Sequence, residues 1–194
     1  MTDEIKQAIP AAYRGIAVAT EKAGFTMASD PLTGSLLRTL AASKPQGSFL
    51  ELGTGTGLST SWILSGMDQK SSLVSLDNDE TLIGIAADFL DHDSRLQLVC
   101  SDGEEWLLAN SNLQFDYIFA DTWHGKYLML DDVLAMLKPG GLYIIDDMLP
   151  QPNWPEGHHL KAIRLVEALE KNDSLLLTKQ IWSTGIVVAT KKAG

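Results

Sequence analysis

The fold is decided by the stretch Ser48-Phe49-Leu50-Glu51-Leu52-Gly53-Thr54-Gly55-Thr56-Gly57-Leu58-Ser59, in which an apolar segment leads into three alternating glycines. The apolar segment is typical of a strand, and the residues from Gly57 to Leu64 indicate a helix. Because glycine lacks a Cβ atom, the backbone can turn sharply here and approach a ligand closely. The start of the helix adds unpaired N–H groups and the positive end of a dipole. A strand, a glycine-rich loop and a helix in this order therefore predict a site for a nucleotide-like ligand.

The spacing of these glycines distinguishes the loop from two familiar phosphate-binding loops. A dinucleotide fingerprint needs glycine at the position of Leu58, which argues against a nicotinamide-dependent oxidoreductase. A P-loop needs a lysine after its last glycine, and none follows Gly57. The order Glu-Leu-Gly-Thr-Gly-Thr-Gly resembles motif I of the class I S-adenosylmethionine (SAM) methyltransferases. The remaining alternative is a glycine-rich turn that holds no ligand.

Strand-like and helical patterns alternate along the chain. The strands are predicted at 48–52, 73–77, 96–99, 115–120, 142–145, 175–181 and 186–190. The helices are predicted within 3–24, from Pro31 with Asp30 as N-cap, at 57–64, 82–90 and 104–109, over 128–137 with an end at Lys138-Pro139-Gly140-Gly141, and at 159–170. This alternation predicts an α/β fold with a Rossmann-like, doubly wound, mostly parallel seven-stranded sheet and helices on both faces. A short connection at 183–185 makes the last two strands an antiparallel hairpin.

Length and composition are consistent with that architecture. The 194 residues are 45% hydrophobic and 21% charged, which predicts one soluble domain over residues 1–194. Within it we expect an N-terminal helical cover at 1–44 and the Rossmann-like core at 48–190.

Charge and cysteine content indicate the setting in which the protein works. The formal net charge of −10 argues against a nucleic-acid partner, which would need clustered Lys and Arg, and favours a small-molecule substrate. The apolar runs are no longer than strands, and the acidic start Met1-Thr2-Asp3-Glu4 does not match a signal peptide, so no membrane association is expected. The single cysteine, Cys100, is expected in the core and fits a reducing cytoplasm. An apolar N-terminal helix could support a homodimer.

Acidic residues stand at the ends of five consecutive predicted strands. They are Glu51, Asp77, Asp102, Asp121 and the pair Asp146-Asp147. Ligands of doubly wound sheets bind beyond the carboxyl ends of the strands, so these residues are candidates for one site. Asp77 lies about 20 residues past the glycine loop, where a carboxylate can accept both hydroxyls of a ribose. Asp77 could instead be a turn or N-cap residue, and Asp102 could cap the helix that starts at Glu104 whether or not it also contacts a ligand.

The resemblance to class I methyltransferases implies which residues would hold SAM. Gly53 would meet the methionine part of SAM, Ser59 its carboxylate, and Asp77 its ribose. Asp102 and Gly103 correspond to a motif that contacts the adenine edge. The residues implied in cofactor binding are therefore Glu51, Gly53, Thr54, Gly55, Ser59, Asp77, Asn78, Asp102, Gly103 and Asp121.

Within that superfamily, the chain is similar to the metal-dependent, catechol-type O-methyltransferases. The resemblance lies in Phe115-Asp116-Tyr117-Ile118-Phe119-Ala120-Asp121-Thr122-Trp123-His124-Gly125-Lys126-Tyr127 and in Leu142-Tyr143-Ile144-Ile145-Asp146-Asp147. It implies that Asp121, Asp146 and Asp147 bind Mg²⁺ or another divalent cation, which would contact two adjacent oxygens of the acceptor. Because they follow two strands expected to be neighbours, the three should converge within a few ångströms, and a cation among them would relieve the repulsion between their charges.

Two residues depart from that family's pattern. The second acidic pair is usually Asp-Asn, and here it is Asp146-Asp147. The family's catalytic lysine is replaced by His124, which could act as a general base near neutral pH or be a surface residue. Lys126 could take the place of that lysine or point elsewhere.

The loop at 149–158 carries further aromatic residues near the acidic pair. Trp154 is expected either to cover the acceptor as a lid or to anchor the loop to the core. Neighbouring residues on a helix do not share a face, so His158 and His159 are expected to be exposed rather than to bind a metal.

The sequence thus predicts a SAM-dependent methyltransferase that methylates an oxygen of a small, catechol-like acceptor with the help of a divalent metal. Asp121 and His124 are its predicted catalytic residues. Three alternatives stay open: a metal-independent methyltransferase, a methyltransferase acting on another acceptor such as RNA, and a SAM-binding protein without catalysis.

Overall fold

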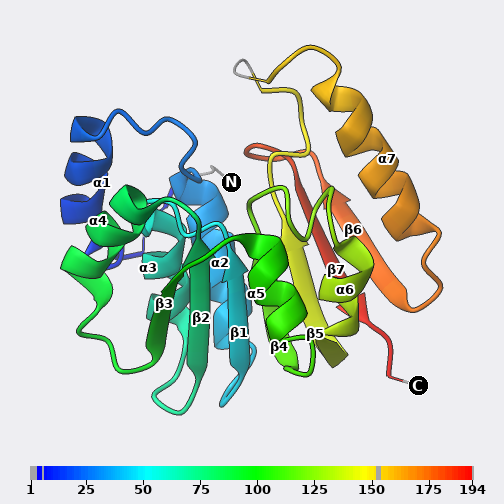
Figure 1. Ribbon diagram of the computed structural model, residues 1–194, viewed down its shortest axis with the longest axis horizontal. Coiled ribbons are helices and arrows are strands. Elements are labelled where there is room, and N and C mark those ends of the chain that lie inside the picture. The colour runs from blue at the N-terminus through cyan, green and yellow to red at the C-terminus, as the bar shows by residue number, and fades with distance from the viewer. Residues whose placement is uncertain (1–3, 6, 152–153, 194) are drawn as a thin grey trace.

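A computed structural model describes residues 4–5, 7–151 and 154–193 of the chain. The described residues form one sheet of seven strands in the order β3-β2-β1-β4-β5-β7-β6 (Figure 1). The strands are β1 (Ser48–Leu52), β2 (Ser72–Asp77), β3 (Leu96–Cys100), β4 (Phe115–Ala120), β5 (Leu137–Ile145), β6 (Leu175–Gln180) and β7 (Ile186–Lys191). The first five strands pair in parallel, and β7 runs antiparallel to both β5 and β6. The predicted sheet and its closing hairpin are confirmed.

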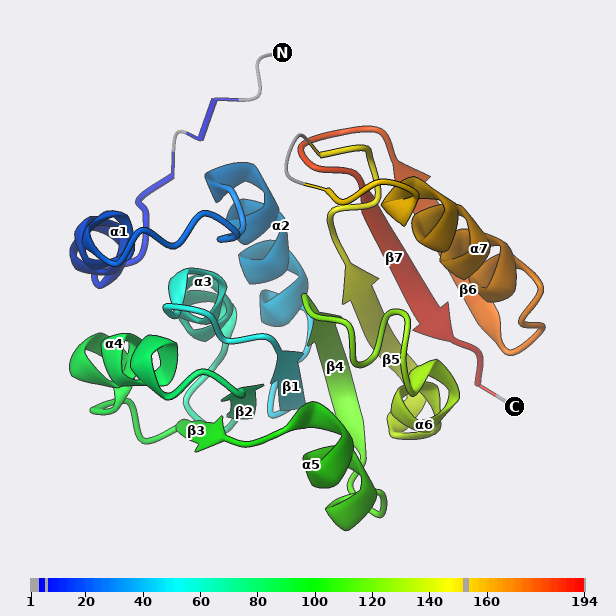
Figure 2. The same ribbon diagram turned by 45° about the horizontal axis from the view of Figure 1, so that its top comes forward.

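Helices cover both faces of this sheet, as predicted (Figure 2). They are α1 (Tyr13–Lys22), α2 (Pro31–Ala42), α3 (Leu58–Gly66), α4 (Glu80–Leu90), α5 (Gly103–Ala109), α6 (Leu130–Ala135) and α7 (His158–Glu170). Successive residues of β1 point to opposite faces. Phe49 joins the apolar cluster under α1 to α4, and Leu50 joins the cluster under α5 to α7.

The starts of the two N-terminal helices can be compared with the prediction. The carboxylate of Asp30 accepts hydrogen bonds from the backbone N–H groups of Leu32 (2.6 Å) and Thr33 (3.1 Å), which confirms the predicted N-cap before Pro31. The first helix is shorter than predicted, because it begins only at Tyr13 and the described residues before it are not helical. Asp3 and Lys6, which the prediction included, lie outside the described residues.

The helix predicted over 128–137 is also too long. It spans only Leu130–Ala135. Leu137, which the prediction placed at the end of the helix, is the first residue of β5. Leu137 is fully buried and pairs with Phe115 in the sheet. Its apolar side chain fitted the spacing of a helix, although its backbone belongs to a strand.

Cys100 is exposed, so the prediction of a core cysteine is wrong. It ends β3, which is the edge strand of the sheet and is covered less than the central strands. Among the described residues, no helix has the length and apolar character needed to cross a membrane.

Candidate active site

The main cavity lies over the carboxyl ends of the strands and has a volume of about 500 Å³. The strand order reverses between β1 and β4, which is the point where open α/β sheets bind ligands. One end of the cavity is lined by the glycine loop, and the other by residues that follow β4 and β5. The linker between α1 and α2 contributes residues 25–29 to the wall. A side cavity of about 310 Å³ adjoins it and shares Asp77, Asn78 and Trp123 with it.

The glycine loop needs its glycines at this place. Gly53 has φ +101°, and a Cβ there would lie 2.8 Å from the backbone oxygen of Asp121. Gly55 has φ +52°, and its N–H donates to Asp77 Oδ2 at 2.8 Å. The left-handed backbone and the close approach both favour residues without a side chain. The loop therefore presents backbone to the main cavity, together with the side chains of Thr54 and Ser59.

Glu51 lies beneath the loop and does not line either cavity. Its side chain is fully buried, and its Oε2 accepts hydrogen bonds from the hydroxyls of Thr60 and Ser75, both at 2.6 Å. Its Oε1 has no hydrogen-bond partner among the described residues. Burial raises the pKa of Glu51 to about 7, although hydrogen bonds from Ser59, Ser75 and Thr60 oppose the shift.

The residues predicted to contact the adenine and the ribose of SAM differ in whether they line a cavity. Asp77 and Asn78 line both cavities, and Gly103 lines the side cavity. Asp102 lines neither, and its carboxylate caps α5 by accepting from the N–H groups of Glu104 (2.9 Å) and Glu105 (3.1 Å). Asp102 is therefore the N-cap of α5, as predicted.

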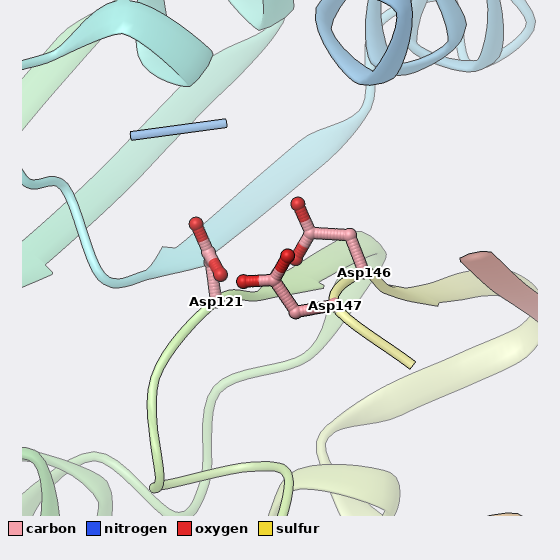
Figure 3. Close-up of side chains that lie close together, drawn as sticks. All are labelled: Asp121, Asp146 and Asp147. Carbon is pink, nitrogen blue, oxygen red and sulfur yellow. The ribbon is translucent and has the colours of Figure 1, made fainter. Parts of the chain in front are cut away.

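Three aspartates converge at the far end of the main cavity (Figure 3). Asp121 follows β4, and Asp146 and Asp147 follow β5. One carboxylate oxygen from each lies within 4.8 Å of the others, which confirms the predicted convergence. Asp146 is 1% exposed, and Asp147 has φ +54°, an unusual conformation for a residue with a side chain. We refer to these three residues as the acidic cluster.

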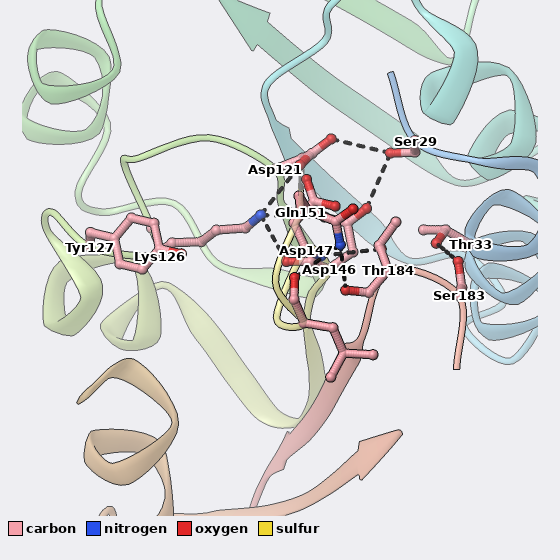
Figure 4. Close-up of polar contacts among 12 residues, drawn as sticks. Ser29, Thr33, Asp121, Lys126, Tyr127, Asp146, Asp147, Gln151, Ser183 and Thr184 are labelled. Atoms are coloured by element: carbon pink, nitrogen blue, oxygen red, sulfur yellow. Dashed lines mark hydrogen bonds and ion pairs between the residues drawn. The ribbon is translucent and has the colours of Figure 1, made fainter. Parts of the chain in front are cut away.

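Lys126 and Ser29 both donate hydrogen bonds to Asp121 and Asp146 of the acidic cluster (Figure 4). The ammonium of Lys126 lies 3.3 Å from Asp121 Oδ1, 3.3 Å from Asp146 Oδ1 and 3.1 Å from the Asp146 backbone oxygen. The hydroxyl of Ser29 lies 3.1 Å from Asp121 Oδ2 and 3.3 Å from Asp146 Oδ2. Each carboxylate oxygen of Asp121 and Asp146 therefore faces a hydrogen-bond donor.

Burial and mutual repulsion shift the pKa values of the acidic cluster. Burial, followed by the charge of Asp146, raises the pKa of Asp121 well above its usual range. The same two causes raise the pKa of Asp147 to about 6, although Lys126 opposes the shift. Burial alone would lower the pKa of Lys126, but the three carboxylates raise it above its ordinary value. Lys126 is therefore a charged ammonium within this cluster.

An aromatic wall stands beside the acidic cluster and lines the same cavity. It consists of Trp123, Tyr127, Trp154 and His158. Ring centroids are 4.6 Å apart for Trp154 and His158, and 5.2 Å apart for Tyr127 and His158. His158 Nε2 lies 3.2 Å from the Tyr127 hydroxyl, and His158 Nδ1 has no hydrogen-bond partner among the described residues.

The prediction that both histidines are exposed is wrong for His158. His159 is exposed, but His158 is only 9% exposed because it packs against Trp154 and Tyr127. Burial, and then the charge of Lys161, lower the pKa of His158. The sequence does not distinguish the two adjacent histidines. Only the fold shows that His158, the first residue of α7, lines the main cavity.

The structure does not bring His124 to the acidic cluster. His124 lines the side cavity, and its Nδ1 lies 2.6 Å from the place where a Cβ on Gly103 would stand. Lys126 reaches the cluster instead, because Gly125 has φ +84° and the N–H groups of Lys126 and Tyr127 both donate to the Trp123 backbone oxygen. The glycine at position 125 was the one sequence signal for such a tight turn.

A family model described as a methyltransferase domain matches residues 50–148. Curated relatives include presumed O-methyltransferases from Mycobacterium sp. strain JLS (30% identical over 121 residues) and Mycolicibacterium vanbaalenii (27% identical over 123 residues). The alignments cover 59% and 61% of this chain, and the chain spans about half of each relative, 54% in both cases.

Solved structures show the same fold at low sequence identity. An O-methyltransferase from Bacillus cereus in complex with S-adenosylhomocysteine (SAH) superposes with a TM-score of 0.84 and 19% identity. That alignment covers 97% of this chain and 94% of the other. The O-methyltransferase TomG from Streptomyces achromogenes, in complex with SAM, has a TM-score of 0.81 and 19% identity, with 97% and 92% coverage.

Proposed function

This chain belongs to the methyltransferase domain family, and from that premise we propose that it transfers the methyl group of SAM to an oxygen of a small acceptor. The observation that carries the proposal is the main cavity itself. One cavity joins the glycine loop and Asp77 to the acidic cluster and the aromatic wall. A methyl donor and an acceptor bound at these two ends would face each other, and such alignment supplies much of what a methyl transfer needs.

SAM is proposed to bind at the glycine-loop end. Gly53, Thr54, Gly55 and Ser59 would contact its methionine part, and Asp77 and Asn78 its ribose, with Gly103 near the adenine. The oxygens of Asp77 already accept from Gly55 N and Asp79 N, but a carboxylate oxygen has further lone pairs for ribose hydroxyls. Glu51 would support the loop from beneath, and Asp102 would hold the start of α5.

The acidic cluster is the proposed site of metal assistance. Three carboxylates whose oxygens approach within 4.8 Å are a donor set that suits a divalent cation such as Mg²⁺. When bound, such a cation would lower the pKa of an acceptor hydroxyl. Asp121 and Asp147 line the cavity, so a cation that they hold would face an acceptor bound there.

The aromatic wall suggests the shape of the acceptor. Trp123, Tyr127 and Trp154 offer ring faces and edges to a planar molecule, in the geometry that aromatic groups favour. The acidic cluster and the net charge of −10 argue against a polyanion such as RNA. We therefore propose a small aromatic acceptor with adjacent oxygens, acted on by a cytoplasmic enzyme.

Calorimetry with SAM and SAH, each with and without Mg²⁺, tests the proposed function. We expect both to bind with a stoichiometry of about one per chain, and an acceptor screen to give a methylated oxygen. Failure to bind SAM together with binding of NAD would contradict the proposal and favour an oxidoreductase. SAM binding without methylation of any acceptor would instead favour a SAM-binding protein without catalysis.

A further inference from the structure

The turn that carries Lys126 is fixed against the core. The hydroxyl of Tyr143 on β5 donates a hydrogen bond to the backbone oxygen of Gly125. A Cβ on Gly125 would lie 2.6 Å from Leu52 Cδ1, so the turn packs closely on β1. Lys126 itself is only 5% exposed. Its ammonium is therefore a built part of the acidic cluster rather than a mobile surface charge.

This ammonium lies on oxygens that a metal ion would need. It contacts one carboxylate oxygen of Asp121 and one of Asp146, both at 3.3 Å. It also donates to the backbone oxygen of Asp146 at 3.1 Å. Buried carboxylates this close repel each other strongly, and a cation among them relieves that repulsion. In this structure the chain supplies such a cation from its own sequence.

We propose that Lys126 is an internal cation that holds the place of a divalent metal, so that a metal binds Asp121 and Asp146 only by displacing the ammonium. The inference rests on the proposed function, because the metal is part of it. Lys126 is then the residue that sets how tightly, and whether, this cluster takes up a divalent ion. It also gives the enzyme a way to keep the cluster ordered without one.

The competition follows from charge. An ammonium and a divalent ion on the same oxygens would repel each other at short range in a site shielded from water. Ser29 contacts the same two aspartates but carries no charge, so it would not oppose a metal in this way. Removing the charge of Lys126 should therefore tighten metal binding, and removing the hydroxyl of Ser29 should not.

The test is Mn²⁺ binding at neutral pH, measured by electron paramagnetic resonance of the free ion with no acceptor present. Lys126→Met removes the charge, and Lys126→Arg keeps it. Ser29→Ala is the control within the cluster. Lys138→Met is the remote control, because it removes a lysine paired with Asp116 at 2.7 Å outside the cluster. Lys126→Gln serves as a second neutral variant if Lys126→Met does not fold.

We expect the neutral variants to bind Mn²⁺ at least about tenfold more tightly than the wild type, which corresponds to about 1.4 kcal/mol. The Lys126→Arg, Ser29→Ala and Lys138→Met variants should stay close to the wild type. Unchanged or weaker Mn²⁺ binding in the neutral variants, or no Mn²⁺ binding in any variant, would overturn the inference. Parallel titrations with SAH keep the two claims apart, since a loss of SAH binding throughout would count against the methyltransferase function alone.

Discussion

The two ends of the main cavity are built in different ways. The glycine-loop end comes from residues within 53–59, with Asp77 added from the next strand, and much of its lining is backbone. The acidic end collects side chains from the linker before α2, from the turn after β4, from the residues after β5 and from the start of α7. The first end depends on backbone shape, and the second depends on charge and on aromatic rings.

This difference indicates how each end should respond to mutation. A backbone site fails when an added atom fills it or when a left-handed residue is strained. A charged site fails or changes its preference when the balance of charges is altered.

Gly53→Ala should weaken SAM binding at least about 100-fold, or by roughly 3 kcal/mol. Its Cβ would stand 2.8 Å from the Asp121 backbone oxygen, at φ +101°. Calorimetry with SAH would measure the loss. The matched control is Gly140→Ala, where φ is +77° but no atom lies within 4 Å of the added Cβ. If both variants bind SAH as tightly as the wild type, SAM binding does not depend on the backbone shape at Gly53.

Glu51→Gln should change how stability depends on pH. The pKa of Glu51 is about 7 in the folded protein against 4.5 as its reference, so the folded state holds its proton more tightly. Stability should therefore fall as pH rises from about 4.5 to 7, by about 3 kcal/mol at most for a shift of this size. Glu51→Gln should remove this decrease. Urea denaturation of both proteins at pH 5 and pH 8 measures it, and parallel pH profiles would contradict the prediction.

Asp77→Ala should weaken SAM binding by about 1.5–3 kcal/mol, the range for a hydrogen bond to a charged group. Part of the loss would come from the loop, because Asp77 accepts the hydrogen bond of Gly55 N. Asp79→Ala is a suitable control, since Asp79 also follows β2 but caps α4 through the N–H groups of Thr81 and Leu82. Equal SAH affinity in Asp77→Ala and the wild type would show that the ribose site has been misplaced.

Trp154→Ala should have the smallest effect and act only at the acidic end. We expect the Michaelis constant for the acceptor to rise severalfold, while SAH affinity and the melting temperature change little, because Trp154 lies on the aromatic wall and is only partly buried. A large drop in melting temperature would instead identify Trp154 as an anchor of the loop.

The contrast between the two ends also explains what the sequence could predict. The glycine loop, the alternation of strands and helices and the N-cap at Asp30 depend on neighbouring residues, and local patterns were sufficient for them. The convergence of the acidic cluster followed from the fold, because parallel strands end at one edge of a sheet.

The remaining features depend on tertiary packing that a local pattern does not contain. The positions of Lys126 and His158 are set by the tight turn at Gly125 and by contacts between α7 and Tyr127. Cys100 is exposed because β3 is an edge strand. Leu137 satisfied a helical pattern although it lies in β5.

The central claim is that the two ends act together in one methyl transfer. The most direct test incubates the protein with SAM carrying a labelled methyl group and a small acceptor with adjacent aromatic hydroxyls, alongside Asp121→Asn. We expect the label on an acceptor oxygen with the wild type, and a strong loss with Asp121→Asn although this variant still binds SAH. Transfer that is equally fast in both proteins would contradict the account, because the acidic end would then take no part in the reaction.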